Sequence, residues 1–179
     1  SKSVCTDSPR IKIFRRTSGS SLREFVNLDK VIALAQSLTD VPIETFSVNE
    51  HTPLQEQAAI FAGTFDILIT PHGSHLANLV FSPTNVSVIE VIACLKERVF
   101  QQNALAMGFK DYIISTGHEI QNCEDRTKNR TPADFGCKLA NSSMVECPNR
   151  ACSILCHCDM KVNIAALAET LARVVSSYC

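Results

Sequence analysis

The chain has 179 residues, of which 45% are hydrophobic and 20% are charged, and its formal net charge at pH 7 is −1. This composition is ordinary for a globular domain large enough to bury a core, and the near-neutral charge argues against a general nucleic-acid binder. No apolar run approaches the roughly 20 residues that span a bilayer. The first five residues lack the apolar core of a signal peptide, so we expect either a removed signal or a piece of a longer protein.

Strand and helix patterns alternate from the start of the chain. Ile11–Phe14 is predicted to form the first strand. A polar loop over residues 15–23 separates it from a helix that follows Asn27, a candidate N-cap. Pro42–Val48 is predicted to form the second strand. Thr52–Gln55 then has the N-cap threonine, the following proline and the later glutamine that are typical of a helix start.

The next elements continue the alternation. Asp66–Ile69 and Val86–Ile92 are almost wholly apolar, as strands buried on both faces of a parallel sheet are. A helical turn is predicted from Ser74, a helix over Glu97–Met107, and a fifth short strand over Tyr112–Ile114. This order predicts an α/β fold with a doubly wound, mostly parallel, Rossmann-like sheet of about five strands and right-handed crossovers.

A cysteine-rich stretch with little periodicity interrupts the pattern after Thr116, and helical spacing resumes over Asn163–Ser177. We therefore divide a single overall domain into three parts. These are a Rossmann-like core over residues 1–120, a disulfide-rich loop insertion over 121–160, and a C-terminal helix over 161–179 that packs on the core.

Nine cysteines are many for this length. The run from Cys147 to Cys158 superficially resembles a zinc site, but the two short ligand pairs with a longer gap that structural zinc sites use are absent. Disulfides are therefore favoured over a metal-binding module. Cys94, at the end of a predicted strand, is the candidate free thiol. The disulfide candidates are Cys5, Cys123, Cys137, Cys147, Cys152, Cys156, Cys158 and Cys179, of which Cys179 could instead bridge to another chain.

Candidate N-glycosylation sites begin at Asn85, Asn129 and Asn141. Such triplets arise often by chance. Three of them together with nine cysteines favour an oxidising compartment. We therefore predict that the protein works in the secretory pathway (the ER or Golgi lumen) or outside the cell.

The segment that follows the strand Asp66–Ile69 is the first candidate for chemistry. In a parallel sheet, ligands bind beyond the carboxyl ends of the strands. Gly73 would let backbone approach a ligand, and the amides of residues 74–76 would open a helix N-terminus that favours phosphate. His72 could donate to phosphate, and Ser74 and Asn78 to ligand hydroxyls. The alternative is an ordinary strand-to-helix turn whose histidines only cap and pack.

Basic residues gather near the amino terminus. Arg15 and Arg16 follow the first strand and fall at the same sheet edge as His72. Guanidinium groups suit bidentate phosphate binding, although a solvated basic loop would have the same composition. Residues 1–23 hold a single acid, Asp7, against Lys2, Arg10, Lys12, Arg15, Arg16 and Arg23.

An acid at Glu90, inside an apolar strand, is costly unless it has a partner. It could accept hydrogen bonds from a ribose diol, or it could pair with an arginine for structural reasons. The chain has no Gly-x-Ser-x-Gly, Walker or Gly-x-Gly-x-x-Gly motif. It also lacks an Asp-x-Asp motif, so we expect no obligatory divalent cation.

Two segments resemble the motifs of glycosyltransferase family 61. Residues 69–83, followed by Val88–Val91, are similar to the family's strand, His-Gly turn, short helix with a following Phe and Pro, and strand ending in an acid or amide. The earlier run with Arg16, Arg23 and Asn27 is similar to the family's first motif, in which two arginines follow a strand and an asparagine precedes a helix. Together the motifs cover about residues 10–115.

This resemblance implies a GT-B-like enzyme of which the chain is the C-terminal, donor-binding half. It implies a UDP-sugar donor, inverting transfer, no metal or other cofactor, and a glycoprotein or polysaccharide acceptor. No catalytic residue is assigned, because the general base is expected across the cleft. The predicted donor-binding residues are Arg16, Arg23, Asn27, His72, Gly73, Ser74, His75, Asn78 and Glu90.

Two features of the chain keep a second function open. Family members carry an N-terminal domain that faces the acceptor, which is not present in this sequence, and residues 121–160 have no counterpart in the family pattern. The alternative is a catalytically inactive, glycosyltransferase-derived domain with a structural or interaction role beside other protein chains.

Overall fold

The computed structural model describes residues 8–16, 23–92, 98–116, 118–121, 138–140, 144–146 and 159–178. The predictions made for the cysteines and for two glycosylation sites lie outside these residues. They concern Cys5, Cys94, Cys123, Cys137, Cys147, Cys152, Cys156, Cys158, Cys179, Asn129 and Asn141.

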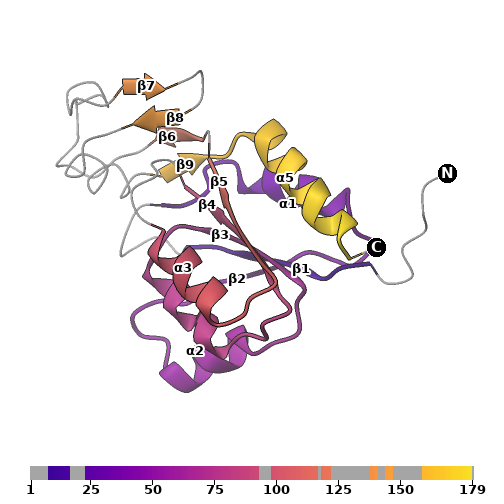
Figure 1. The fold of residues 1–179 in the computed structure, drawn as a ribbon, viewed down its shortest axis with the longest axis vertical. Coiled ribbons are helices and arrows are strands. Elements are labelled where there is room, and N and C mark those ends of the chain that lie inside the picture. The colour runs from indigo at the N-terminus through magenta and orange to yellow at the C-terminus, as the bar shows by residue number, and fades with distance from the viewer. Residues whose placement is uncertain are drawn as a thin grey trace.

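Five parallel strands form the central sheet, in the order β2-β1-β3-β4-β5 (Figure 1). The central strands β3 and β4 are buried at every position, as parallel strands covered on both faces are, whereas the edge strand β2 is largely exposed. The chain moves outward in one direction from β1 and in the other from β3, so the predicted doubly wound, Rossmann-like sheet is confirmed. The strands are β1 (Ile11–Phe14), β2 (Glu44–Phe46), β3 (Ile67–Pro71), β4 (Ser87–Val91) and β5 (Asp111–Ser115).

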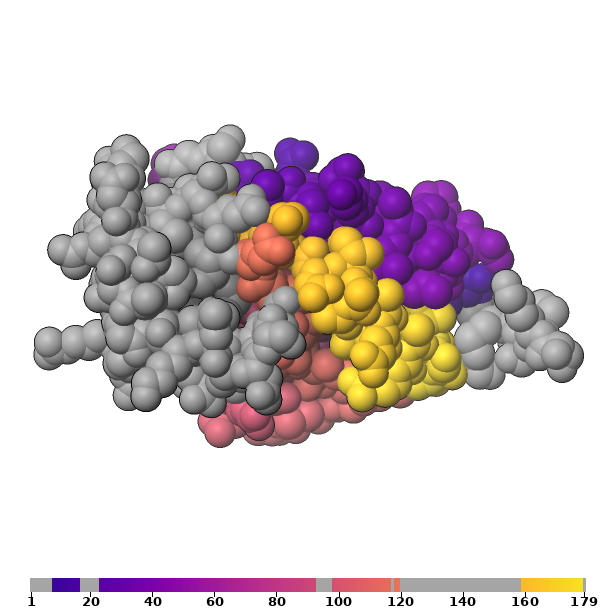
Figure 2. Space-filling view, turned by 90° about the horizontal axis from the view of Figure 1, so that it is seen from above, coloured from indigo at the N-terminus to yellow at the C-terminus, as the bar shows by residue number. Residues whose placement is uncertain are grey.

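Helices cover both faces of the sheet (Figure 1). On one face lie α2 (Leu54–Phe61), the 3-10 helix η1 (Ser74–Phe81) and α3 (Val99–Ala106), around a core that includes Phe14 and Leu68. On the other face lie α1 (Leu28–Gln36) and the C-terminal helix α5 (Ile164–Ser176). Figure 2 shows α5 lying alongside α1.

Short antiparallel strands follow the central sheet in the chain. Strand β6 (Glu119–Gln121) pairs with β9 (Asp159–Lys161), and β7 (Lys138–Ala140) pairs with β8 (Met144–Glu146). Strand β9 also meets the loop before α1, where Phe25 and Met160 form a parallel bridge. This bridge attaches the chain beyond the cysteine-rich stretch to the carboxyl edge of the central sheet.

Of two predicted helix caps, one is confirmed in position and one is wrong. Asn27 is the N-cap residue of α1, as predicted, although its side chain pairs with the backbone of Val162 and makes no cap hydrogen bond. Helix α2 begins at Leu54 with Pro53 as the N-cap residue, because the hydroxyl of Thr52 is engaged with Asn49. The cap of α5 does form, since the Asn163 side chain accepts from the Ala166 amide at 3.2 Å.

Asn85, the one described glycosylation candidate, is exposed in the turn that enters β4. It therefore lies at the amino-terminal edge of the sheet. Among the described residues, no helix combines the length and apolar character needed to cross a membrane.

Candidate functional site

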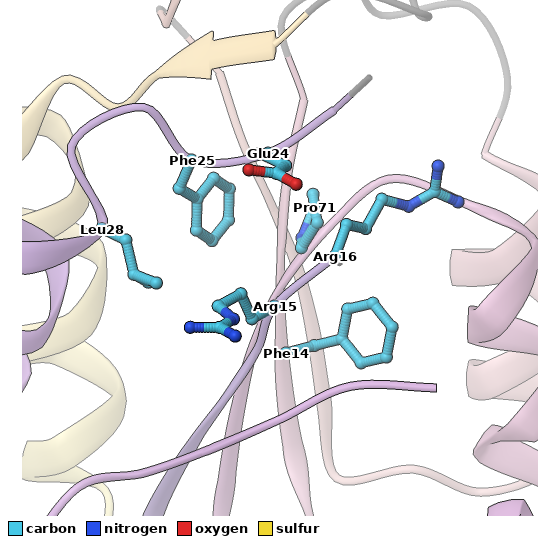
Figure 3. Close-up of a pocket in the computed structure, with 7 residues that line it drawn as sticks. All are labelled: Phe14, Arg15, Arg16, Glu24, Phe25, Leu28 and Pro71. Atoms are coloured by element: carbon cyan, nitrogen blue, oxygen red, sulfur yellow. The ribbon is translucent and has the colours of Figure 1, made fainter. Parts of the chain in front are cut away.

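The candidate site lies where the strand order reverses, at the carboxyl ends of the adjacent strands β1 and β3. Arg15 and Arg16 directly follow β1, and His72 and Gly73 directly follow β3. A pocket of about 340 Å³ opens between these ends and the loop that enters α1 (Figure 3). Its lining residues are Phe14, Arg15, Arg16, Glu24, Phe25, Leu28 and Pro71.

The side chains of the two arginines after β1 extend to different sides of this sheet edge. In Figure 3, Arg15 extends among the pocket-lining residues near Leu28, whereas Arg16 extends to the other side of the strand end. Arg16 there reaches the turn after β3. A Cβ atom placed on Gly73 would lie only 2.6 Å from Arg16 Nη2. Residue 73 must therefore be glycine if this guanidinium is to lie against the turn.

A second guanidinium lies close enough to affect the first. Burial and the positive charge of Arg23 lower the pKa of Arg16 to about 10. Arg16 still carries its charge at neutral pH, so two guanidinium cations lie near each other at this edge. Arg23 Nη1 also approaches the carbonyl oxygen of His72 at 3.5 Å, which links both motifs at one place.

His72 is oriented by two buried groups behind it. Its Nδ1 atom lies 2.5 Å from Glu90 Oε1, and the Tyr112 hydroxyl donates to Glu90 Oε2 at 2.7 Å. The Glu90 residue is only 2% exposed, while the His72 side chain is 31% exposed. Burial and the Glu90 charge raise the pKa of Tyr112, so its hydroxyl stays protonated. The arrangement engages Nδ1 and leaves Nε2 as the imidazole nitrogen that can meet a ligand.

His75 is packed in the core beneath the turn at Gly73. Its ring stacks on Phe14 with centroids 3.8 Å apart, and its Nε2 lies 2.6 Å from Thr70 Oγ1. Burial, followed by the nearby charges of Arg16, His72 and Arg23, lowers the pKa of His75 well below its ordinary value. His75 is therefore a neutral, packed residue under Gly73.

The structure brings together only part of the predicted site. Arg16, Arg23, His72 and Gly73 converge, with Glu90 directly behind His72. The Asn27 amide exchanges two hydrogen bonds with the backbone of Val162, at 2.8 and 2.9 Å. Besides the packed His75, two predicted donor-binding residues are left. Ser74 is exposed at the turn, and Asn78 donates to Gln57 at 2.8 Å.

Two expectations about individual groups need correction. The partners of Glu90 are a histidine and a tyrosine, not an arginine. The turn after Gly73 begins a 3-10 helix, so the Leu76 amide donates to the Gly73 carbonyl and is not available to a phosphate.

Sequence reasoning missed Tyr112 and Asp159. The phenol of Tyr112 sits in the same face of the sheet as Glu90, since β4 and β5 pair Val88 with Tyr112 and Glu90 with Ile114. Period-2 alternation in the two strands could have indicated this. Asp159 accepts from the backbone amides of Arg23 and Glu24 at 2.8 and 2.9 Å. Nothing in the local sequence connects residues so far apart in the chain.

The motif residues up to position 89 fall within a known sequence family. Residues 2–89 match the glycosyltransferase 61 family. A β-1,2-xylosyltransferase from Oryza sativa subsp. japonica is 36% identical over 84 residues. Residues 2–89 of the chain belong to the glycosyltransferase 61 family. The match covers 47% of this chain and 17% of the rice enzyme, so the chain spans only a small part of the length of this relative.

A solved structure was also found to be similar to this glycosyltransferase 61 domain. It is described as a CpaE2 pilus assembly protein from Sinorhizobium meliloti 1021. The similarity covers 59% of this chain and 86% of that chain, with 12% sequence identity and a TM-score of 0.34. At these values the likeness carries no structural or functional argument.

Proposed function

We propose that this glycosyltransferase 61 domain binds the nucleotide-sugar donor of a sugar-transfer reaction, with a UDP-sugar as donor. The observation that carries the proposal is the convergence of Arg16 and Arg23 on the Gly73 turn beside His72. Guanidinium groups and an oriented imidazole are suited to a diphosphate. The location also supports the proposal, because ligands of open α/β sheets bind where the strand order reverses.

The diphosphate would lie over Gly73. Arg16 and Arg23 would contact its oxygens, and His72 would meet it through Nε2. In an inverting transfer, the acceptor oxygen forms a bond to the anomeric carbon as the bond from that carbon to the diphosphate breaks. Negative charge then grows on the departing diphosphate. Fixed cations in a partly buried site stabilise that charge without a metal ion, which supports the metal-independent reading.

The pocket beside this turn would take the nucleoside. Its volume of about 340 Å³ and its apolar residues Phe25, Leu28 and Pro71 suit a base and a ribose. Glu24, also in the lining, would accept hydrogen bonds from ribose hydroxyls. Glu90 is not the ribose ligand in this scheme, because both of its oxygens are engaged behind His72.

The complete enzyme would have a GT-B-like arrangement in which another part supplies the acceptor side and the general base. The small share of the rice enzyme that this domain matches supports such a division. A glycoprotein or polysaccharide is the proposed acceptor. The cysteine content and the sequons, together with the family, support a location in the secretory pathway or outside the cell.

Calorimetric titration of the chain with UDP tests the donor site. We expect saturable binding, a rise in melting temperature with UDP concentration, and no change on adding EDTA. Uridine should bind much more weakly, because it lacks the diphosphate that the arginines would contact. An absence of UDP binding at millimolar concentration would contradict the proposal and favour the catalytically inactive, structural role. Binding that requires a divalent cation would contradict its metal-independent part.

A further inference from the structure

Asp159 is a buried acid that lies beyond the family match and touches the backbone of the site. Asp159 is 8% exposed. A single oxygen, Oδ1, accepts from the Arg23 amide at 2.8 Å and from the Glu24 amide at 2.9 Å. An acid is costly to bury unless its hydrogen bonds are made, so this contact with the loop is a specific one.

The backbone of Arg23 has a conformation that requires outside support. Its φ angle is 106°, in the left-handed region that residues other than glycine rarely adopt. Such a conformation persists only where the surroundings hold it, and it is typical of functional sites. The Arg23 amide that Asp159 binds belongs to this same strained residue. The carboxylate therefore stabilises the conformation that aims the Arg23 side chain at the His72 carbonyl.

The docking of β9 on the loop does not depend on this carboxylate. The Met160 amide donates to the Glu24 carbonyl and the Val26 amide donates to the Met160 carbonyl, each at 2.9 Å. The Asn27 side chain and the Val162 backbone add two more hydrogen bonds. These contacts attach the strand to the loop by themselves. Among the described residues, the Asp159 side chain accepts hydrogen bonds from the amides of residues 23 and 24.

We propose that Asp159 is a positioning residue that holds Arg23 in the orientation needed for contact with the donor diphosphate. The proposal rests on the donor function proposed above. It also extends the site beyond residue 89, where the family match ends. Strand β9, which follows the cysteine-rich stretch, would then supply a residue that supports Arg23 in the amino-terminal motif. The role is exerted through Arg23, with no contact between Asp159 and the donor.

UDP titration of three variants of the full chain tests this role. Asp159→Ala should weaken UDP binding about tenfold, the effect of losing one charge-assisted hydrogen bond to phosphate. Asp159→Asn keeps an oxygen that can accept from both amides, so its affinity should stay within about threefold of wild type. Lys161→Ala is the matched control, because Lys161 lies on the same strand and pairs with exposed Glu119 at 2.9 Å, away from the loop. Its affinity should not change.

A double-mutant cycle and hydrogen exchange separate positioning from general stability. In an Arg23→Ala background, Asp159→Ala should cause no further loss of UDP affinity. Exchange at the amides of residues 23 and 24 should quicken in Asp159→Ala while exchange in α2 stays unchanged.

The outcomes distinguish this proposal from the donor function. Equal UDP affinity in wild type and Asp159→Ala, or an equal loss in the Arg23→Ala background, would overturn the positioning role and leave the donor function standing. If wild type does not bind UDP, the donor function fails and the positioning role toward a diphosphate fails with it. Unchanged amide exchange in that case would also remove the backbone role.

Discussion

The two ends of the central sheet use the same residue type in opposite ways. At the amino end, Arg10 donates to Asp66 through its backbone amide and its guanidinium, at distances of 2.8 to 3.1 Å. Its hydrogen bonds and its attraction to Asp66 raise the pKa of Arg10. At the carboxyl end, burial and Arg23 lower the pKa of Arg16 to about 10.

This difference matches the roles proposed for the two arginines: Arg10 is structural, and Arg16 is proposed to contact the donor diphosphate. Arg10 is neutralised within the fold, so a further anion gains little there. Arg16 lies near a like charge, which together with burial lowers its pKa. Charged groups with shifted pKa values are common at functional sites. Removing the same type of residue at each end of the sheet and comparing the effects is therefore the most direct test of the site.

The largest expected effect comes from removing one arginine at each end. Arg16→Ala should weaken UDP binding roughly 10- to 100-fold, because a charge-assisted contact is worth about 1.5–3 kcal/mol. Arg10→Ala should change UDP affinity less than about twofold. Thermal melting should show Arg10→Ala slightly less stable than wild type, because its ion pair with Asp66 is lost. A similar loss of affinity in both variants would mean that the two ends do not differ in function.

The second test compares two glycines. Gly73→Ala would place a Cβ atom 2.6 Å from Arg16 Nη2, so the flexible end of Arg16 must move away from the turn. We expect about a tenfold loss of UDP affinity with a loss of about 1 kcal/mol or more in stability. Gly108→Ala is the control, because Gly108 has a φ of 85° and no atom within 4 Å of an added Cβ. That change should lower stability by about 1 kcal/mol and leave UDP affinity unaltered.

The third test compares two tyrosine hydroxyls, one at each end. Tyr112→Phe removes the donor to buried Glu90 and should lower stability by about 1 kcal/mol and UDP affinity about threefold, since Glu90 orients His72. Tyr178 donates to the Asp66 carbonyl at 2.7 Å at the amino end. Tyr178→Phe should lower stability by a similar amount without changing UDP affinity. Chemical denaturation and titration of both variants would measure this, and equal affinities in the two would contradict a role for Glu90 in orienting His72.

The smallest effect is the acid dependence of the amino end. Burial raises the pKa of Asp66, but the hydrogen bonds and charge of Arg10 outweigh it, so the net pKa is lowered. A lowered pKa in the folded state stabilises the fold above the ordinary aspartate pKa, and that stability is lost as the pH falls through the folded value. Arg10→Ala should therefore reduce the loss of stability below about pH 4. Denaturation curves of wild type and variant at pH 3 and pH 7 would measure it, and parallel acid profiles would contradict the assignment.

Much of the fold could be predicted because its signals are local. The apolar runs of β3 and β4 marked buried parallel strands, and the spacing in Ile164–Ser176 marked a helix with one apolar face. Asn27 is the predicted N-cap residue of α1 but makes no side-chain cap hydrogen bond, and Thr52 is not the N-cap of α2, for a common reason. Each residue is a good cap by type, but each side chain found a different partner: Val162 for Asn27, and Asn49 for Thr52.

The candidate site was predictable in its location more than in its partnerships. Both arginines and the His-Gly turn follow strands whose carboxyl ends share one edge, and that follows from the order of elements. The partners of Glu90 depended on which strand lies beside β4 and on the phase of its side chains. The contact between Arg23 and Asp159 depended on a segment 136 residues away.

The amino-acid sequence by itself determined the order of strands and helices, the doubly wound sheet and the family motifs, because hydrophobic periodicity and turn residues act over short distances. The tertiary structure alone decided which polar groups meet. Arg16 rests on Gly73, Glu90 holds His72, and Asp159 binds the backbone at Arg23. These pairings could not be read from the periodic patterns in the sequence, for a physical reason. A buried polar group takes whichever donor or acceptor the closed fold brings within hydrogen-bond distance, and that partner is seldom its neighbour in the chain.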